Sequence, residues 1–254
     1  MELKKISYSG MSTYKSCPKK YHYSYVRGMW PDKKAEPLVV GSAIHKVLAK
    51  QYELLQENKK LSIKDANALF LTELKSEPMD IDEKKRTPET IALDLKPVID
   101  KICKNPLKVK PKNVERFFQV DFKNPLTGEI LEPRLSGIID LDTEDGEIYE
   151  HKSAGRVWTD DNIKSTLQHV VYYVGYYNLH HKKPTKIFYH VIYKHPKSGI
   201  DLFEVNISDI DIMNFFNVAR SIIKNIQNDN WVATPGRFQC RFCDYNNICQ
   251  NSIM

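Results

Sequence analysis

The sequence lacks the features of a secreted, membrane-spanning or repetitive protein. No stretch of its 254 residues is long and apolar enough to span a bilayer, and the first residues lack the apolar core of a signal peptide. Internal repeats and low-complexity linkers are also absent from the sequence. We therefore expect a cytoplasmic globular protein that does not bind membranes.

Cysteine is scarce and odd in number. The five cysteines are Cys17, Cys103, Cys240, Cys243 and Cys249, and an odd count without a secretion signal argues against a disulfide framework. The last three form a Cys-x-x-Cys pair followed by a third cysteine, a spacing that brings thiolates onto one metal. A fourth ligand must come from elsewhere, and spacing alone leaves zinc and an iron–sulfur cluster both open. Taken alone, Cys17 is better explained as a small buried hydrophobic residue than as a ligand.

The chain has no strong excess of either charge. Its net charge is +6 and its pI is near 8.9, which permits nucleic-acid binding without requiring it. Lys84, Lys85, Lys108, Lys110 and Lys112 fit either a solvated face or a basic wall along a nucleic-acid channel. With 41% hydrophobic and 28% charged residues, the composition is that of an ordinary globular protein of roughly one or two domains.

A β-hairpin is predicted near the middle of the chain. Residues 135–141 and 147–152 are β-type runs on either side of an acidic turn that ends in Asp-Gly, a strong hairpin signal. Asp140 closes the first run, while Glu150 and Lys152 are two apart on the second and therefore share one face. The hairpin would bring two carboxylates and an ammonium group into one small site.

This trio suits phosphodiester cleavage. Carboxylate oxygens are hard ligands for Mg²⁺ or Mn²⁺, which polarise a phosphate and lower the pKa of a bound water. A neighbouring lysine supplies a compact positive charge for the developing transition state. From the hairpin alone, the favoured interpretation is instead a surface hairpin that ends in an ordinary Glu–Lys pair, because exposed pairs of this kind are common.

The remaining pattern predicts an α/β protein in which helices flank a mixed central sheet. Helices are expected at residues 12–27, 41–55, 62–74, 88–103, 160–181 and 208–227, and strands at residues 114–122, 130–141, 147–153, 186–193 and 202–207. The segment 160–181 has strand-like composition near its centre, but its length and its acidic start favour a helix. Taken alone, His45 in the second helix is typical of an ordinary hydrogen-bonded histidine.

Together, these pieces resemble the PD-(D/E)XK nuclease superfamily in its RecB-like branch. More closely, they are similar to the iron–sulfur nucleases related to the exonuclease of CRISPR adaptation and to phage exonucleases. The matching motifs, in chain order, are Ser-Thr-Tyr-Lys-Ser-Cys-Pro at 12–18, Gly-x-x-x-His ending at His45, Gly-Ile-Ile-Asp ending at Asp140, Glu150-His-Lys152, Gln168-x-x-x-Tyr172 and the C-terminal cysteines. Ile139 stands where the superfamily's name has proline.

The resemblance implies a role for each matched residue. It implies a Mg²⁺ or Mn²⁺ site made by His45, Asp140, Glu150 and the backbone carbonyl of His151, with Lys152 assisting the attacking water. Gln168 and Tyr172 would share one helix face and position substrate or Lys152, although an amphipathic helix with a buried tyrosine is the alternative. The resemblance implies a structural [4Fe–4S] cluster, in preference to zinc, whose ligands are Cys17, Cys240, Cys243 and Cys249. Cys103 matches no motif and is expected to pack in the interior.

The resemblance also implies an architecture and a function. Residues 1–254 would form one domain with a restriction-endonuclease-like core, in which 1–112 are a helical region, 113–207 the core and 208–254 the last helix and cluster segment. The implied activity is metal-dependent DNA cleavage, exonucleolytic on single-stranded DNA or ends. The alternatives are a non-catalytic DNA-binding or docking subunit and a processing subunit of a CRISPR adaptation complex. Protein partners in recombination or replication, and assembly into an oligomer, are compatible with each of these functions.

Overall fold

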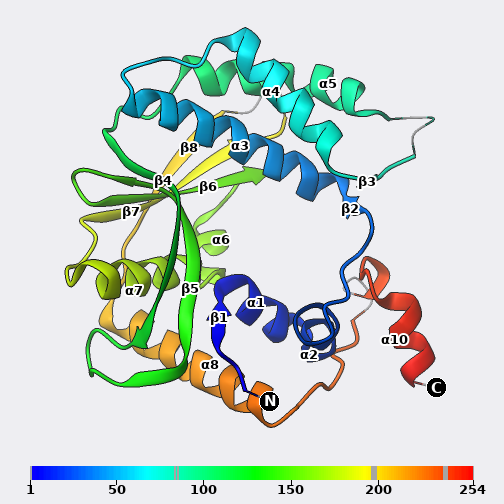
Figure 1. Ribbon diagram of the computed structural model, residues 1–254, viewed down its shortest axis with the longest axis vertical. Helices are drawn as coiled ribbons and strands as arrows, with labels where there is room; N and C mark the ends of the chain where they lie inside the picture. The colour runs from blue at the N-terminus through cyan, green and yellow to red at the C-terminus, as the bar shows by residue number, and fades with distance from the viewer. Residues whose placement is uncertain (1, 83, 85, 196–198, 237–239, 254) are drawn as a thin grey trace. The chain divides into compact units, whose positions relative to one another are not determined.

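The chain folds into two compact units (Figure 1). The structure, a computed structural model, describes residues 2–82, 84, 86–195, 199–236 and 240–253. The first unit comprises Met1–Asp32, Gln119–Gly137 and Ser208–Met254, and the second comprises Lys33–Phe118 and Ile138–Ile207. Every helix within the described ranges is too short or too polar to cross a bilayer.

A mixed sheet forms the centre of the second unit, as the sequence predicts. Its strands are the end of β5 (Ile130–Thr143), β6 (Glu147–Ala154), β7 (Lys186–Tyr193) and β8 (Ile200–Val205). β5 and β6 are antiparallel, β6 and β7 are parallel, and β7 and β8 are antiparallel. β4 (Pro111–Lys123) pairs with β5, and both strands contribute residues to each unit.

The predicted hairpin is confirmed. Leu141 of β5 pairs with Tyr149 of β6, and the turn closes where the Gly146 amide donates to the Thr143 carbonyl at 3.0 Å. Gly146 has a φ of 80°, a conformation that glycine adopts without steric cost. The hairpin therefore holds Asp140 and Glu150 on adjacent strands.

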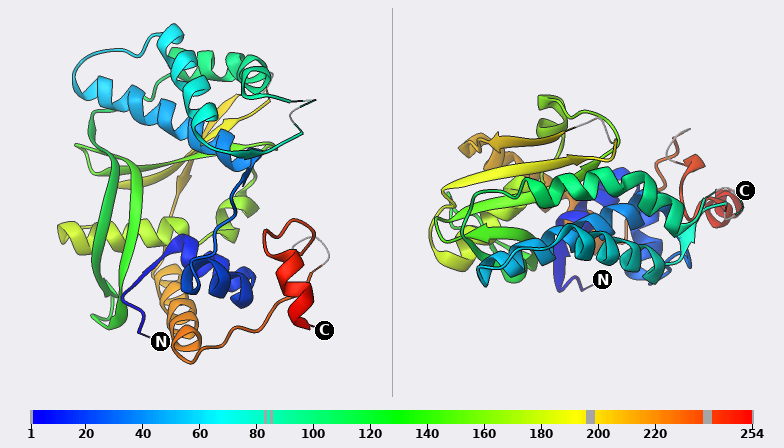
Figure 2. Two further views of the ribbon diagram at one scale, coloured as in Figure 1. Left: turned by 45° about the vertical axis from the view of Figure 1, so that its right-hand side comes forward. Right: turned by 90° about the horizontal axis from the view of Figure 1, so that it is seen from above.

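Three helices cover one face of the second unit's sheet. They are α3 (Glu36–Gln56), α4 (Ile63–Ser76) and α5 (Pro88–Lys104), and they lie side by side (Figures 1 and 2). Their apolar stripes form one core with strand residues such as Leu141 and Tyr149. The short strands β2 (Lys34–Ala35) and β3 (Met79–Asp80) pair in parallel beside them.

β7 is buried on both faces, which explains its continuous apolar sequence. Phe188 and Ile192 face the core of α3–α5, whereas Tyr189, Val191 and Tyr193 belong to a second cluster. This alternation follows from the two-residue period of a strand. The second face lies beneath the crossover from β6 to β7, which contains α6 (Asp160–Ser165) and α7 (Gln168–His180).

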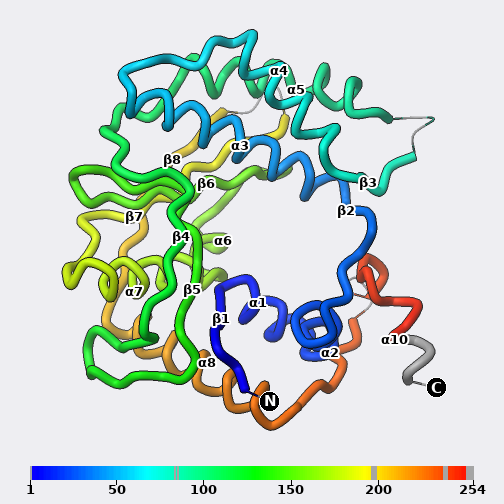
Figure 3. Tube along the Cα trace, viewed as in Figure 1, coloured from blue at the N-terminus to red at the C-terminus, as the bar shows by residue number. Residues whose placement is uncertain are grey.

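The first unit joins the two ends of the chain. Its elements are β1 (Lys5–Ser7), α1 (Tyr8–Ser16), α2 (Pro18–Tyr21), the π-helix η1 (His22–Val26), α8 (Asp209–Gln227) and α10 (Asn246–Ile253). The segment after α8 returns beside the N-terminal helices (Figure 3). There the indole ring of Trp231 stacks on Tyr21 and His22 at centroid distances of 6.0 and 5.1 Å. The hydroxyls of Ser24 and Tyr245 are hydrogen-bonded at 2.9 Å.

The prediction of one continuous helix at residues 12–27 is wrong both in its first residue and in its lack of a break. It begins at Tyr8 with Ser7 as its cap, because the Ser7 hydroxyl accepts from the Gly10 amide at 3.2 Å. It then breaks at Cys17, whose φ of −161° and ψ of 112° are extended. Pro18 causes the break, since proline disfavours the α conformation of the preceding residue and favours the first turn of a new helix.

Two other helix boundaries differ from expectation. α3 begins at Glu36, before Gly41, because Pro37 can occupy its first turn. The expected helix 160–181 is divided into α6 and α7, where Thr166 is extended with a ψ of 144°. The Thr166 hydroxyl accepts from the Gln168 amide at 3.2 Å, which offers the backbone an alternative to a continuous helix. Gln168 therefore lies at the start of α7.

Candidate active site

Asp140 lies at the end of β5 and is held from two sides. Its Oδ2 accepts from the backbone N–H of His151 at 2.7 Å and lies 3.6 Å from His45 Nδ1 on α3. Burial alone would raise the pKa of Asp140, but the His45 and His151 contacts outweigh it and the pKa is lowered. Burial likewise opposes the charged form of His45, yet the Asp140 carboxylate raises the pKa of that imidazole. Asp140 is therefore a buried carboxylate that remains ionised.

Glu150, Lys152, Gln168 and Tyr172 form one hydrogen-bonded network. Lys152 Nζ donates to Glu150 Oε1 and to Gln168 Oε1, each at 2.6 Å. The Gln168 amide nitrogen donates to Glu150 Oε1 at 2.7 Å and to the Tyr172 hydroxyl at 2.6 Å. Gln168 and Tyr172 are four residues apart on α7, so both side chains reach the same face of β6. The network fixes the position of the Lys152 ammonium group.

The second carboxylate oxygen of Glu150 is buried and unsatisfied. Oε2 has no hydrogen-bond partner among the described residues, although Glu150 is only 3% exposed. Burial and the nearby Asp140 charge raise the pKa of Glu150, and the Lys152 ammonium only partly offsets them. A desolvated carboxylate oxygen without a hydrogen-bond donor among the described residues fits a cation ligand, because a bound cation would hold Glu150 in its charged form.

Glu115 is a candidate ligand that the sequence motifs did not identify. Its carboxylate on β4 and the ligand atoms of His45 and Asp140 all lie within 4.8 Å of one another. Burial and the Asp140 charge raise the pKa of Glu115. The backbone at Glu115 has a φ of 50°, unusual for a residue other than glycine. No motif marks this position.

The His151 side chain points away from this network. Its ring stacks on Tyr52 of α3 at a centroid distance of 5.5 Å, and its Nδ1 lies 3.0 Å from His190 Nδ1. Burial lowers the pKa of His151 to about 3 and that of His190 to about 4, so both rings are neutral at pH 7. The strand alternation that aims Glu150 and Lys152 at α7 aims His151 at α3. The His151 backbone N–H is therefore the group that hydrogen-bonds Asp140, while the ring lies toward α3, with its centroid 6.1 Å from that of His45.

We expect Glu150→Gln to stabilise the metal-free protein. Because folding raises the pKa of Glu150 above 4.5, this group contributes stability below pH 4.5 and loses it as pH rises through the folded-state value. Near pH 7.5 the uncharged variant should gain about 1–2 kcal/mol of unfolding free energy. Thermal unfolding of both proteins across pH 5 to 8 measures the difference.

Adding Mg²⁺ or Mn²⁺ should then stabilise the native chain more than the Glu150→Gln variant. Glu204→Gln is the matched control, because Glu204 is a solvent-exposed carboxylate on β8 that pairs with Lys186. Equal stabilisation of native and Glu150→Gln proteins by the cation would contradict a ligand role for Glu150.

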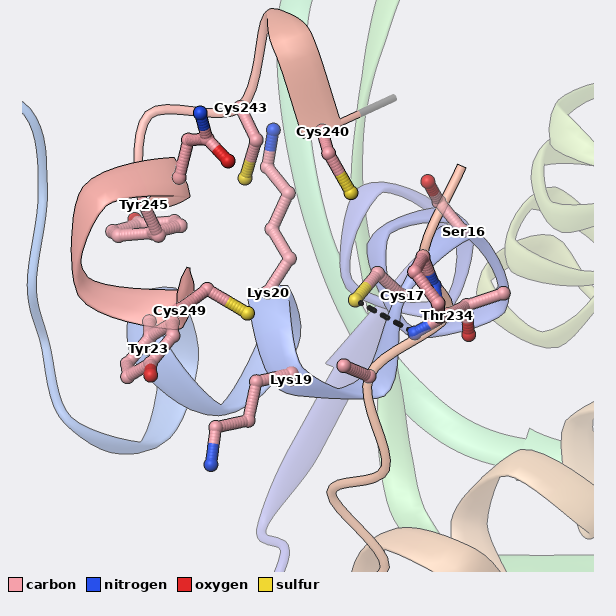
Figure 4. A pocket seen from close by; sticks show the side chains of 13 residues that line it. Ser16, Cys17, Lys19, Lys20, Tyr23, Thr234, Cys240, Cys243, Tyr245 and Cys249 are labelled. Atoms are coloured by element: carbon pink, nitrogen blue, oxygen red, sulfur yellow. Dashed lines mark hydrogen bonds between the residues drawn. The ribbon is translucent and has the colours of Figure 1, made fainter. Parts of the chain in front are cut away.

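In the first unit, four cysteines line one cavity. The sulfurs of Cys17, Cys240, Cys243 and Cys249 point into the same space, whose volume is about 430 Å³ (Figure 4). None of the four belongs to a disulfide among the described residues, whereas Cys103 packs against the core of α3–α5 in the second unit. The break at Pro18 places Cys17 between two helices, where its side chain reaches this cavity.

Backbone amides also point at two of these sulfurs. The Thr234 amide donates to Cys17 Sγ at 3.5 Å, and the Gly236 amide donates to Cys240 Sγ at 3.4 Å. Donors of this kind favour thiolate over thiol and are typical around metal-bound sulfur. For Cys243, burial opposes the thiolate form and raises the pKa of the thiol. Four converging sulfurs with amide donors fit a metal or iron–sulfur centre.

Comparisons with known proteins identify a family and a similar fold. The sequence model of the PD-(D/E)XK nuclease superfamily matches residues 5–250. The crystal structure of a candidate exonuclease from Eubacterium rectale is similar, with a TM-score of 0.60 and 14% identity over 96% of this chain and 88% of that one. The match to a structure of the protein SSO0001 extends over 100% of this chain and 89% of that one. The two chains are 12% identical, and the TM-score is only 0.48. A search of curated protein sequences finds no match.

Proposed function

The chain belongs to the PD-(D/E)XK nuclease superfamily, and from this membership we propose that it is a divalent-cation-dependent DNA exonuclease acting on single-stranded DNA or on DNA ends. The observation that carries the proposal is the buried pair Asp140 and Glu150 with the Lys152 ammonium group hydrogen-bonded beside them. The exonuclease name of the Eubacterium rectale structure supports the exonucleolytic mode.

The cation would be Mg²⁺ or Mn²⁺, held by Asp140, Glu150, His45 and the His151 carbonyl, with Glu115 as an additional carboxylate. Hard oxygen ligands with one imidazole suit these ions. The chemistry that such an ion supplies is polarisation of a phosphate oxygen and a lower pKa for water. The unsatisfied Glu150 Oε2 and the Glu115, His45 and Asp140 atoms within 4.8 Å support this ligand set.

Lys152 would act on the reacting groups directly. Its ammonium group is held by two hydrogen bonds and leaves one N–H free to bind the attacking water or a phosphate oxygen. A fixed charge in a partly buried site stabilises developing negative charge without reorganisation. Gln168 positions that ammonium group through its amide oxygen, and Tyr172 is hydrogen-bonded to the Gln168 amide.

Cleavage of end-labelled linear and circular single-stranded DNA tests the proposed function. With Mn²⁺ or Mg²⁺, linear DNA should be degraded and circular DNA should remain intact, and excess EDTA should abolish the reaction. Cutting of the circle would replace the exonuclease by an endonuclease. Binding of either DNA without any cleavage would support the alternative of a non-catalytic DNA-binding or docking subunit.

The cysteine cavity would hold a structural [4Fe–4S] cluster, bound by Cys17, Cys240, Cys243 and Cys249. This would place the chain among the RecB-like iron–sulfur nucleases, the group that includes the exonuclease of CRISPR adaptation. The four converging sulfurs and the amide donors support the cluster (Figure 4). Because these cysteines come from both ends of the chain, the cluster would tie the first unit together.

A further inference from the structure

A cavity beside His45 is not explained by the cation site. Its volume is about 540 Å³, and it is lined by α3, the end of β6 and the segment that follows β7. His45 and Glu115 contribute to its wall, so it adjoins the candidate cation ligands. The other polar groups of the lining are the ammonium groups of Lys46 and Lys194 and the hydroxyls of Ser42 and Ser153.

Lys194 is a partly buried cation of this lining. It follows β7 directly, and its backbone N–H donates to the Ala154 carbonyl at 2.8 Å, which fixes it beside the end of β6. Among the described residues, no hydrogen bond or ion pair engages its ammonium group, and burial lowers its pKa. Glu36 is the acidic group that acts on Lys194, but that carboxylate is paired with Arg86 at 2.9 Å. Lys194 is therefore available to an anion.

The other polar groups come from the close approach of α3 to β6. A Cβ atom at Gly41 would lie 3.0 Å from Ser153 Oγ, so the absence of a side chain at Gly41 makes room for that hydroxyl. Ser42 and Lys46 are four residues apart on α3 and therefore share one face of the helix. Two ammonium groups and two hydroxyls thus line one cavity.

We propose that this cavity is a subsite for a nucleic-acid phosphate next to the one that is cleaved, with Lys194 as its principal contact. Lysine ammonium and serine hydroxyl groups are common phosphate ligands. The one carboxylate in the lining, Glu115, would be neutralised by the cation that it helps to hold. The inference rests on the proposed function, because it assigns a second phosphate to the same substrate strand.

The test is DNA binding by Lys194→Gln in a Lys152→Ala background without added Mg²⁺ or Mn²⁺, where cleavage is expected to be too slow to obscure binding. Affinity for a labelled single-stranded oligonucleotide should fall about tenfold, and the slope of log affinity against log salt should decrease by about 0.7. Lys194→Arg should retain most of the affinity. Lys186→Gln is the matched control, because Lys186 is an exposed lysine at the opposite end of β7.

In the cleavage-competent protein, Lys194→Gln should raise KM with little change in kcat, since the residue would contact a phosphate that does not react. Oligonucleotides with a 5′-phosphate or a 5′-hydroxyl, and a circular strand, identify the source of the phosphate. Dependence on Lys194 confined to one labelled end assigns the subsite to a terminal phosphate. Equal dependence for all three substrates assigns it to an internal phosphodiester.

Affinity and KM of Lys194→Gln equal to those of Lys186→Gln would overturn the subsite while the nuclease proposal stands. A native chain that neither binds nor cleaves DNA would overturn the proposed function, and the subsite with it. DNA cleavage by the native chain therefore distinguishes the two failures, because it persists when only the subsite is wrong.

Discussion

Lys152→Ala is expected to lower kcat for DNA cleavage by about a hundred- to a thousandfold, the usual cost of removing a fixed charge from a reacting centre. The variant should still fold, because Glu150 has a raised pKa and can take up a proton when the ammonium group is lost. DNA binding should change much less than kcat, since other contacts hold the strand. Single-turnover cleavage with Mn²⁺, together with thermal unfolding, measures these quantities.

Lys186→Ala is the control for a non-specific loss of positive charge from the same sheet. Gln168→Ala should give a smaller loss than Lys152→Ala, because it leaves the ammonium group present but less well positioned. Cleavage by Lys152→Ala at the native rate would remove this residue from the chemistry. Undiminished DNA binding with no cleavage by the native chain would favour the non-catalytic subunit.

The hairpin that carries Asp140, Glu150 and Lys152 was predictable because its signals are local. The Asp-Gly turn and the alternation of strand residues are properties of about fifteen consecutive residues, and the structure reproduces both. The starts of the helices expected at 62–74 and 208–227 were predictable for the same reason, since Ser62 and Ser208 each accept from an amide three residues ahead.

The start of the first helix was not predictable in this way. Ser7 and Ser12 are both acceptable caps in sequence, and Ser7 is the one used. The choice follows from a pairing distant in sequence, because Ser7 is the last residue of β1 and lies opposite Ser136 of β5. A local pattern carries no information about that register.

Glu115 and Lys194 were missed because only the tertiary fold brings them to the site. Glu115 reaches His45 and Asp140 through a backbone conformation with positive φ in β4, which no local signal indicates. Lys194 is one of many lysines in a basic sequence, and its partly buried place beside the end of β6 depends on the tertiary contact of its backbone N–H with Ala154. Composition identifies the excess of lysine, but it does not indicate which lysine lies partly buried beside His45.

The largest expected effect on stability comes from Cys17→Ser. If the cysteine cavity holds a [4Fe–4S] cluster, this change should lower bound iron well below about four atoms per chain and remove absorbance near roughly 400 nm. The midpoint of thermal unfolding should fall by about 10 °C or more, because structural metal sites contribute several kcal/mol and about 1 kcal/mol shifts the midpoint by roughly 2–4 °C. Anaerobic purification with metal analysis measures the content of iron and zinc.

Cys103→Ala is the matched control for Cys17→Ser, because Cys103 packs against the core of α3–α5 and belongs to the other unit. It should keep the full metal content and lose only a small packing contribution. Zinc in place of iron in the native chain would change the identity of the centre but keep the same four ligands. Full metal retention by Cys17→Ser would contradict the assignment of Cys17.

Because this centre joins segments from both chain termini, its loss should unfold the first unit before the second, and thermal unfolding should then show two transitions.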